Sequence, residues 1–207
     1  MIKCNVTVCG TIIRSAQMRN NKDGKAFLAF GVSVEIPAKA GINKTFEISV
    51  AKDGDMDELN SLTSGTRIEV IGVLTFHKKD DTIFMNMSAT GVNTLNAGTE
   101  DSMKGEIEFR GTVGNKIEEK TDKKGNPYLV FSAFSSEKDG EGYSFIWVRF
   151  MQFGQGKPEW MHGKCGIDAT GEFHLSVYNN SLDLTCRVAK LTKWEKQSYQ
   201  GSVTNIQ

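Results

Sequence analysis

Residues 143–154, read as a β-strand, carry the side chains of this chain that are best suited to bind a ligand. Side chains alternate between the two faces of a strand, and one face here is an ordinary core stripe of Ile146, Val148 and Phe150. The other face carries aromatic rings with a guanidinium among them: Phe145, Trp147, Arg149, Met151 and Phe153. Rings interleaved with positive charge suit a surface that stacks unpaired bases and neutralises their phosphates. The pattern therefore predicts binding of single-stranded nucleic acid.

The same aromatic face supports a second interpretation. Aromatic strand faces also mediate protein association, so Phe145, Trp147 and Phe153 would instead be buried in a subunit interface, with Phe145 the foremost candidate. In that case the protein would be an interaction or oligomerisation module without nucleic-acid binding. Quenching of tryptophan fluorescence by oligo-dT favours the first interpretation, and a buried Trp147 that does not respond to DNA favours the second.

An internal repeat organises the chain. Residues 6–11 match residues 107–112 at an offset of 101, and this match aligns Gly10 with Gly111. At an offset of 99, Ile68 and Gly72 fall on Ile167 and Gly171. Residues 24–30 also match residues 125–131 at the offset of 101. Three matches in the same order indicate two copies of one module with a short loop deletion between them.

Each copy is predicted to have five strands. In the first copy we expect them at residues 2–13, 26–36, 44–52, 66–77 and 82–92; in the second, at 104–117, 127–137, 143–152, 164–176 and 181–191. Gly10 and Gly111 would let the long first strands bend, so that one strand serves both sides of a barrel. Asp55 would cap a short helix over residues 55–62, with Glu58 completing a capping box.

This order of elements predicts an all-β protein made of two tandem OB-folds, which are five-stranded Greek-key barrels. The short helix between strands three and four belongs to the first barrel. The predicted domains are residues 1–101 and 102–193, with a linker at 95–104 and a C-terminal tail at 194–207.

Further candidate binding residues follow from this fold. Phe27 is predicted to be the one aromatic side chain on the outer face of its strand, beside small residues. Tyr128 and Phe134 lie on the same face of the corresponding strand in the second copy. The loops and turns that border the ligand channel of an OB-fold hold basic or aromatic residues: Arg14, Lys25, Lys78 and Lys79 in the first copy, and Lys116, Lys123, Lys124 and Tyr178 in the second. Lysines there would track phosphates, with a solvated loop as the alternative for any one of them.

Composition narrows the function classes. The 207 residues hold 25 basic and 25 acidic side chains, so binding must depend on a local groove rather than on net charge. The sequence has no apolar run near the roughly 20 residues of a membrane span and no secretory leader, which predicts a cytoplasmic protein. The four cysteines and three histidines lack metal-ligand spacing, and no nucleophile or phosphate-loop motif occurs. We therefore expect no enzyme, no cofactor and no metal.

The spacing of Trp147, Arg149 and Phe153-Gly154 resembles the third strand of the bacterial single-stranded DNA-binding protein family. The resemblance implies that Trp147 and Phe153 stack on DNA bases and that Arg149 contacts a phosphate or a base. Two departures stand out, because the chain lacks the family's acidic C-terminal tail and carries two barrels instead of one. The resemblance implies a homodimer, in which two chains with two barrels each would supply four barrels. Stacking does not sense the 2′-hydroxyl, so RNA remains an alternative to DNA.

The two copies are not equivalent. Aligning their core stripes places Glu47 of the first copy where the second has Trp147. A carboxylate repels phosphates and does not stack on bases. The sequence therefore predicts that the second copy is the principal binder, with the first weaker or structural.

Overall fold

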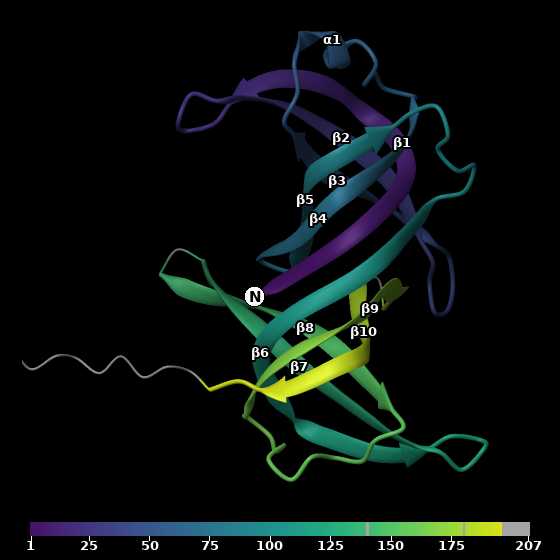
Figure 1. The fold of residues 1–207 in the computed structure, drawn as a ribbon, viewed down its shortest axis with the longest axis vertical. Coiled ribbons are helices and arrows are strands. Elements are labelled where there is room, and N and C mark those ends of the chain that lie inside the picture. The colour runs from purple at the N-terminus through teal and green to yellow at the C-terminus, as the bar shows by residue number, and fades with distance from the viewer. Residues whose placement is uncertain (140, 180, 196–207) are drawn as a thin grey trace, which may run out of the picture.

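The computed structural model describes residues 1–139, 141–179 and 181–195, most of them in strands (Figure 1). The first barrel comprises β1 (Ile2–Asn20), β2 (Ala26–Ile36), β3 (Lys44–Lys52), β4 (Arg67–Lys79) and β5 (Thr82–Asn93), with the single turn of α1 (Met56–Leu59) before β4. The second comprises β6 (Ser102–Thr121), β7 (Pro127–Asp139), β8 (Gly142–Phe153), β9 (Gly166–Tyr178) and β10 (Ser181–Lys193). Of the predicted tail, residues 196–207 lie outside the described part.

Strand pairing confirms the predicted fold class. In the first barrel the strands follow the order β2-β3-β5-β4-β1, and pairing of β1 with β2 closes the ring. The second barrel repeats this order with β7-β8-β10-β9-β6. In both, the third and fifth strands are parallel and all other neighbours are antiparallel. This is the closed five-stranded Greek-key arrangement of the OB-fold.

Two glycines allow the first strands to bend as predicted. β1 pairs with β4 up to Thr11 and with β2 from Thr11 onward, so the strand changes partner next to Gly10. A Cβ atom added at Gly10 would lie 2.4 Å from the carbonyl oxygen of Ser33, and one added at Gly111 would lie 2.2 Å from that of Phe134. Only glycine permits such a close approach of two backbones.

The barrels join through their first strands, which lie side by side across the middle of the molecule (Figure 1). β1 and β6 are antiparallel from the pair Ile2–Phe109 to the pair Cys9–Ser102. At the centre of this ladder Asn5 pairs with Glu106, and these two residues occupy equivalent positions in the repeat. The junction is therefore a pseudo-two-fold contact. It occupies the edge of β1 that faces β6 and the edge of β6 that faces β1, so both edges are paired within one chain.

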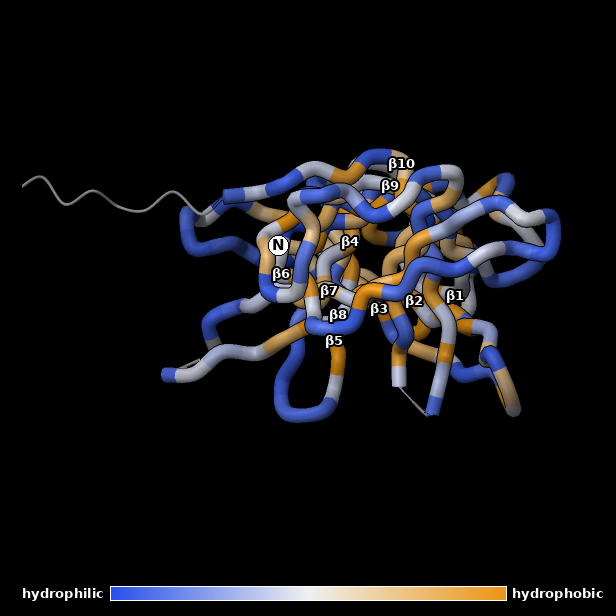
Figure 2. Tube along the Cα trace, turned by 90° about the horizontal axis from the view of Figure 1, so that it is seen from below, coloured by the Kyte–Doolittle hydropathy of each residue, from blue (hydrophilic) through white to orange (hydrophobic). Residues whose placement is uncertain are grey.

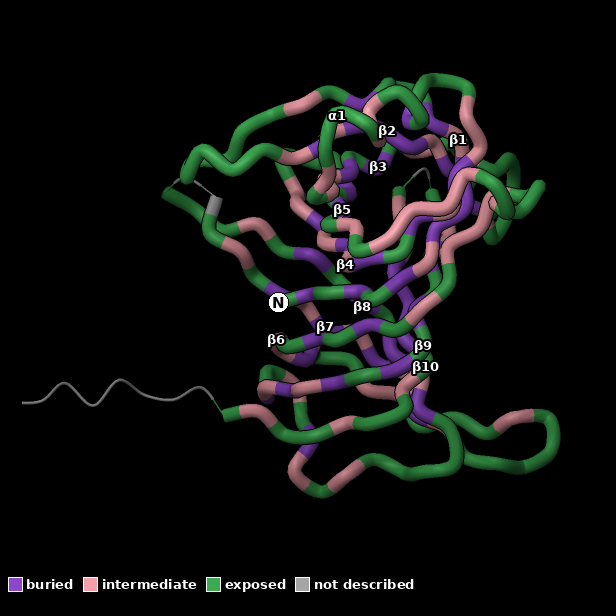
Figure 3. The backbone as a smooth tube through the Cα atoms, turned by 45° about the horizontal axis from the view of Figure 1, so that its top comes forward, coloured by how far each residue is buried: buried purple, intermediate pink, exposed green. Residues whose placement is uncertain are grey.

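Contacts outside this ladder strengthen the junction. The rings of Phe76 on β4 and Phe173 on β9 pack with their centroids 6.0 Å apart, and Lys39 forms an ion pair with Asp183. The buried apolar residues of both barrels belong to one continuous cluster. Apolar segments gather inside the sheets in Figure 2, and in Figure 3 buried residues follow the strands while the loops are exposed.

Several strands run further than predicted. β1 continues to Asn20 and β6 to Thr121, because each pairs with the following strand up to a tight turn. Arg14 and Lys116 therefore lie on strands, not in loops as expected. Lys78 and Lys79 likewise lie at the end of β4, which pairs with β5 up to Thr82.

The short helix and the linker also differ in detail from the expectation. Asp55 caps α1 as predicted by accepting hydrogen bonds from the backbone N–H groups of Asp57 and Glu58. Glu58 does not complete a capping box, because its carboxylate pairs with Lys52 instead. The predicted linker ends early, since β6 begins at Ser102 to pair with β1. No helix within the described residues has the length and apolar character to cross a membrane.

Candidate nucleic-acid interface

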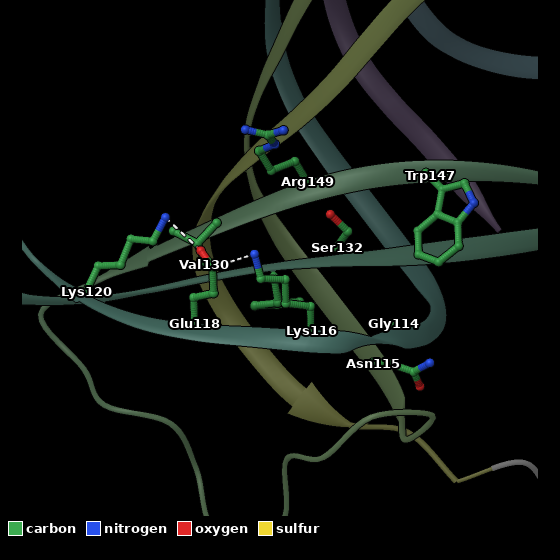
Figure 4. Close-up of a pocket in the computed structure, with 10 residues that line it drawn as sticks. Gly114, Asn115, Lys116, Glu118, Lys120, Val130, Ser132, Trp147 and Arg149 are labelled. Carbon is green, nitrogen blue, oxygen red and sulfur yellow. Dashed lines mark ion pairs between the residues drawn. The ribbon is translucent and has the colours of Figure 1, made fainter.

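A groove of about 410 Å³ opens on the second barrel between the start of the β6–β7 hairpin and the outer face of β7 and β8 (Figure 4). β6 contributes Gly114, Asn115, Lys116, Glu118 and Lys120; β7 contributes Val130, Phe131 and Ser132; β8 contributes Trp147 and Arg149. Three of the predicted binding residues, Lys116, Trp147 and Arg149, therefore line one groove.

Strand alternation directs Trp147 outward. Ile146, Val148 and Phe150 are buried in the barrel, whereas Trp147 between them is 52% exposed. Its indole packs against Phe134 on the neighbouring strand, with ring centroids 4.9 Å apart and planes inclined by 56°. Gly114 lies beneath the indole, since a Cβ added there would come within 3.1 Å of it. The ring is thus supported from one side and open to solvent on the other.

A second aromatic pair lies further along the same two strands. Tyr128 and Phe153 face each other across the β7–β8 ladder and stack with centroids 5.3 Å apart and planes 19° from parallel. The guanidinium of Arg187 on β10 lies 5.3 Å from the centre of the Phe153 ring. Phe153 lies six positions beyond Trp147 on β8, a distance of about 20 Å along the strand.

The electrostatics of the groove centre on Glu118, which lies between two lysines (Figure 4). Its carboxylate forms ion pairs with Lys116 and, at 2.7 Å, with Lys120. Hydrogen bonds from these two ammonium groups lower the pKa of Glu118 to about 2, and the bond to Glu118 raises the pKa of Lys120. The carboxylate is therefore charged at neutral pH. Among the described residues, no carboxylate lies within ion-pair distance of Arg149.

The first barrel has a smaller groove at the equivalent place, of about 260 Å³. Phe27 and Arg14 line it, together with polar side chains such as Gln17 and Asn86. Strand pairing confirms that Glu47 occupies the position of Trp147, because Glu47 pairs with Ser33 as Trp147 pairs with Phe134. Glu47 forms a 2.7 Å ion pair with Arg14, so this pair stands where the second barrel has its indole.

The remaining predicted residues do not line either groove. Lys25 forms a 2.5 Å ion pair with Asp53 at the end of the first barrel. Lys123 and Lys124 lie exposed in the β6–β7 turn, which Asp122 closes by accepting hydrogen bonds from the N–H groups of Lys124 and Asn126. Tyr178 lies exposed at the end of β9, where the adjacent Val177 forms an isolated bridge with Ala38 of the first barrel.

Several residues of the groove and of the aromatic pairs were not predicted from the sequence, among them Glu118, Ser132 and Arg187. Glu118 shares a strand face with Lys116 and Lys120 because the three are spaced two residues apart, a signal that appears only once β6 is known to reach Thr121. Arg187 reaches Phe153 because β10 pairs in parallel with β8. That register has no local sequence signal. Within the described residues, no cluster of three or more His, Cys, Asp or Glu side chains is arranged to hold a metal.

Similar folds occur among solved structures. The single-stranded DNA binding protein from Thermus aquaticus matches over 100% of this chain and 98% of its own, at 14% sequence identity and a TM-score of 0.47. A small single-stranded DNA-binding protein from Streptomyces coelicolor matches 47% of this chain and 97% of its own, at 18% identity and a TM-score of 0.35. The protein PriB from Ralstonia solanacearum covers 44% of this chain and 97% of its own, at 12% identity and a TM-score of 0.34.

Two of these three solved structures are of single-stranded DNA-binding proteins. All three TM-scores lie below 0.5, so the assignment of two OB-folds rests on the strand order and pairing of the chain itself. No protein-family model and no curated protein matches the sequence.

Proposed function

We propose that this protein binds single-stranded DNA with little sequence preference, mainly through the second barrel. The observation that carries the proposal is the groove in which a half-exposed indole, Trp147, shares one wall with the guanidinium of Arg149. Base–aromatic stacking tolerates any sequence because every base has a π-face. A guanidinium and the lysines of β6 supply the positive charge that a phosphate backbone requires.

The proposed path of the strand runs along the outer face of β7 and β8. It begins at the stacked pair of Tyr128 and Phe153, passes Arg149, and ends at Trp147 with its supporting Phe134. The two aromatic pairs lie about 20 Å apart along this face, so different bases of one strand would stack on them.

The first barrel is proposed to contribute less. Its groove has Phe27 as an aromatic wall, but the position of Trp147 is filled by the ion pair between Arg14 and Glu47. Arg14 is therefore neutralised by a neighbour and has to leave that neighbour to contact a phosphate. In the second barrel, Arg149 is available without such a step.

We also propose that the protein forms a homodimer, which would bring four barrels together. Because β1 and β6 pair with each other, a second copy would have to join through sheet faces and not through these strand edges. Light scattering is expected to give twice the mass of one chain. The mass of a single chain in dilute and concentrated samples alike would refute this part of the proposal.

The central test is a titration of the full chain with labelled oligo-dT, oligo-U and duplex DNA at several salt concentrations. We expect oligo-dT to bind more tightly than duplex DNA, with an affinity that falls as salt rises, because phosphate contacts release counterions. Oligo-U distinguishes DNA from RNA as the preferred ligand. No binding of either single strand would refute the proposal and favour a protein-interaction module, whose partner would cover the cluster of Trp147, Phe134 and Phe145.

A further inference from the structure

Glu118 occupies a position in the groove that nucleic-acid binding does not explain. Its carboxylate is negatively charged, yet it lies on the wall where the proposed function places phosphates. It forms ion pairs with both lysines of that wall. Its side chain is 28% exposed, whereas that of Lys116 is 85% exposed. Glu118 is thus the least exposed of the three side chains in the cluster.

The repeat offers an internal comparison. At the offset of 101, Gln17 of the first barrel is the equivalent of Glu118, and Arg19 is the equivalent of Lys120. Gln17 lines the groove of the first barrel, and its amide oxygen lies 3.5 Å from the Arg19 guanidinium. The same contact between neighbouring positions on one strand face therefore exists without a negative charge. The fold of the hairpin does not need a carboxylate at this position.

We infer that Glu118 is a built-in competitor for phosphate, which limits the affinity of the second groove for single-stranded DNA. This inference rests on the proposed function. A carboxylate and a phosphate oxygen are both acceptors for the same ammonium groups, so a phosphate that contacts Lys116 or Lys120 must displace Glu118 or share its lysine. While Glu118 stays in place, the two lysines neutralise less phosphate charge than unpaired lysines would. Binding then releases fewer counterions from the DNA.

Replacing Glu118 with glutamine, the residue at the equivalent position of the first barrel, removes the charge and keeps the shape. We expect E118Q to bind oligo-dT about fivefold more tightly at low salt, which is the size of one exposed charge–charge interaction. The salt dependence should also steepen, because each additional phosphate contact adds about 0.7 to the slope of log K against log salt for a single strand.

E119Q is the matched control. Glu119 is the next residue on β6, is exposed, and does not line the groove, so this substitution makes the same change in net charge on the other face of the strand. Anisotropy of labelled oligo-dT is measured for wild type, E118Q and E119Q at four salt concentrations. A K120Q background is added, because the gain from E118Q should shrink once one of the two lysines that it frees is gone.

The outcomes separate the two proposals. Tighter binding and a steeper slope for E118Q than for E119Q support the competitor role. If wild type binds oligo-dT but E118Q binds no more tightly than E119Q, Glu118 holds the lysines in place or is neutral, and the inference is overturned while the proposed function stands. If none of the three proteins binds oligo-dT, the proposed function itself fails, and the competitor role with it.

Discussion

Replacing Trp147 with alanine should weaken oligo-dT binding by about 5- to 150-fold, the largest loss expected from any single substitution in the groove. One base–aromatic stack contributes about 1–3 kcal/mol, and each 1.4 kcal/mol is a tenfold change in affinity. The indole is half-exposed and supported from behind by Phe134 and Gly114, so its open face is already presented to a base. Anisotropy of labelled oligo-dT measures the change.

Two alanine variants serve as controls for W147A. F84A removes a ring that is 48% exposed on β5 of the first barrel and lines neither groove, so we expect its affinity to equal that of wild type. F27A removes the aromatic wall of the first groove and should weaken binding less than W147A does. Equal losses for W147A and F27A would contradict the dominance of the second barrel.

The assembly of the same variants distinguishes base stacking from a subunit interface. If Trp147 is part of a protein contact, W147A should lower the mass found by light scattering without a change in DNA affinity. If Trp147 stacks on bases, the mass should stay constant while the affinity falls. The two roles of the aromatic face thus predict opposite results from one protein sample.

The sequence predicted the fold well because strand alternation is a local signal. The core stripes of β3 and β8 and their outward residues follow from the period of two, and Trp147, Glu47 and Phe27 lie on the faces that this period assigns. Gly10 and Gly111 marked the bends of the first strands for a similar reason, since glycine in a long strand indicates a close backbone approach.

The charged part of the site was less predictable because it depends on pairing between side chains. Arg14 and Lys116 were expected as free loop cations, yet both lie on strands and pair with carboxylates. The strand length that brings Lys116, Glu118 and Lys120 onto one face is set by the hairpin with β7 and not by local propensity. Arg187 required the parallel register of β10 against β8, a contact between distant segments.

The junction between the barrels is the feature that a sequence repeat predicts least. A repeat indicates two similar units but does not say whether they share a core. Here β1 and β6 form a single ladder, and the buried residues of both barrels form one cluster. The two grooves are therefore held in a fixed relation, and a fragment of one barrel would expose a face that the other normally covers. Binding tests accordingly belong on the full chain.

Replacing Phe173 with alanine tests this shared core. Phe173 is 2% exposed on β9 and packs on Phe76 of the other barrel, which is 3% exposed. Removing a buried phenylalanine lowers the free energy of unfolding by about 3–5 kcal/mol. We expect a loss of this size in urea unfolding, with both barrels still unfolding together. F84A, at an exposed position, should stay within about 0.5 kcal/mol of wild type.

Two spectroscopic probes report whether the barrels are coupled. All three tryptophans, Trp147, Trp160 and Trp194, lie in the second half of the chain, so their fluorescence follows the second barrel, whereas far-UV circular dichroism follows the strands of both. Coincident transitions indicate one cooperative unit. If fluorescence instead changes at lower urea than circular dichroism in wild type, the barrels unfold separately. The first strands then join two independent domains, and the two grooves are free to bind separate strands.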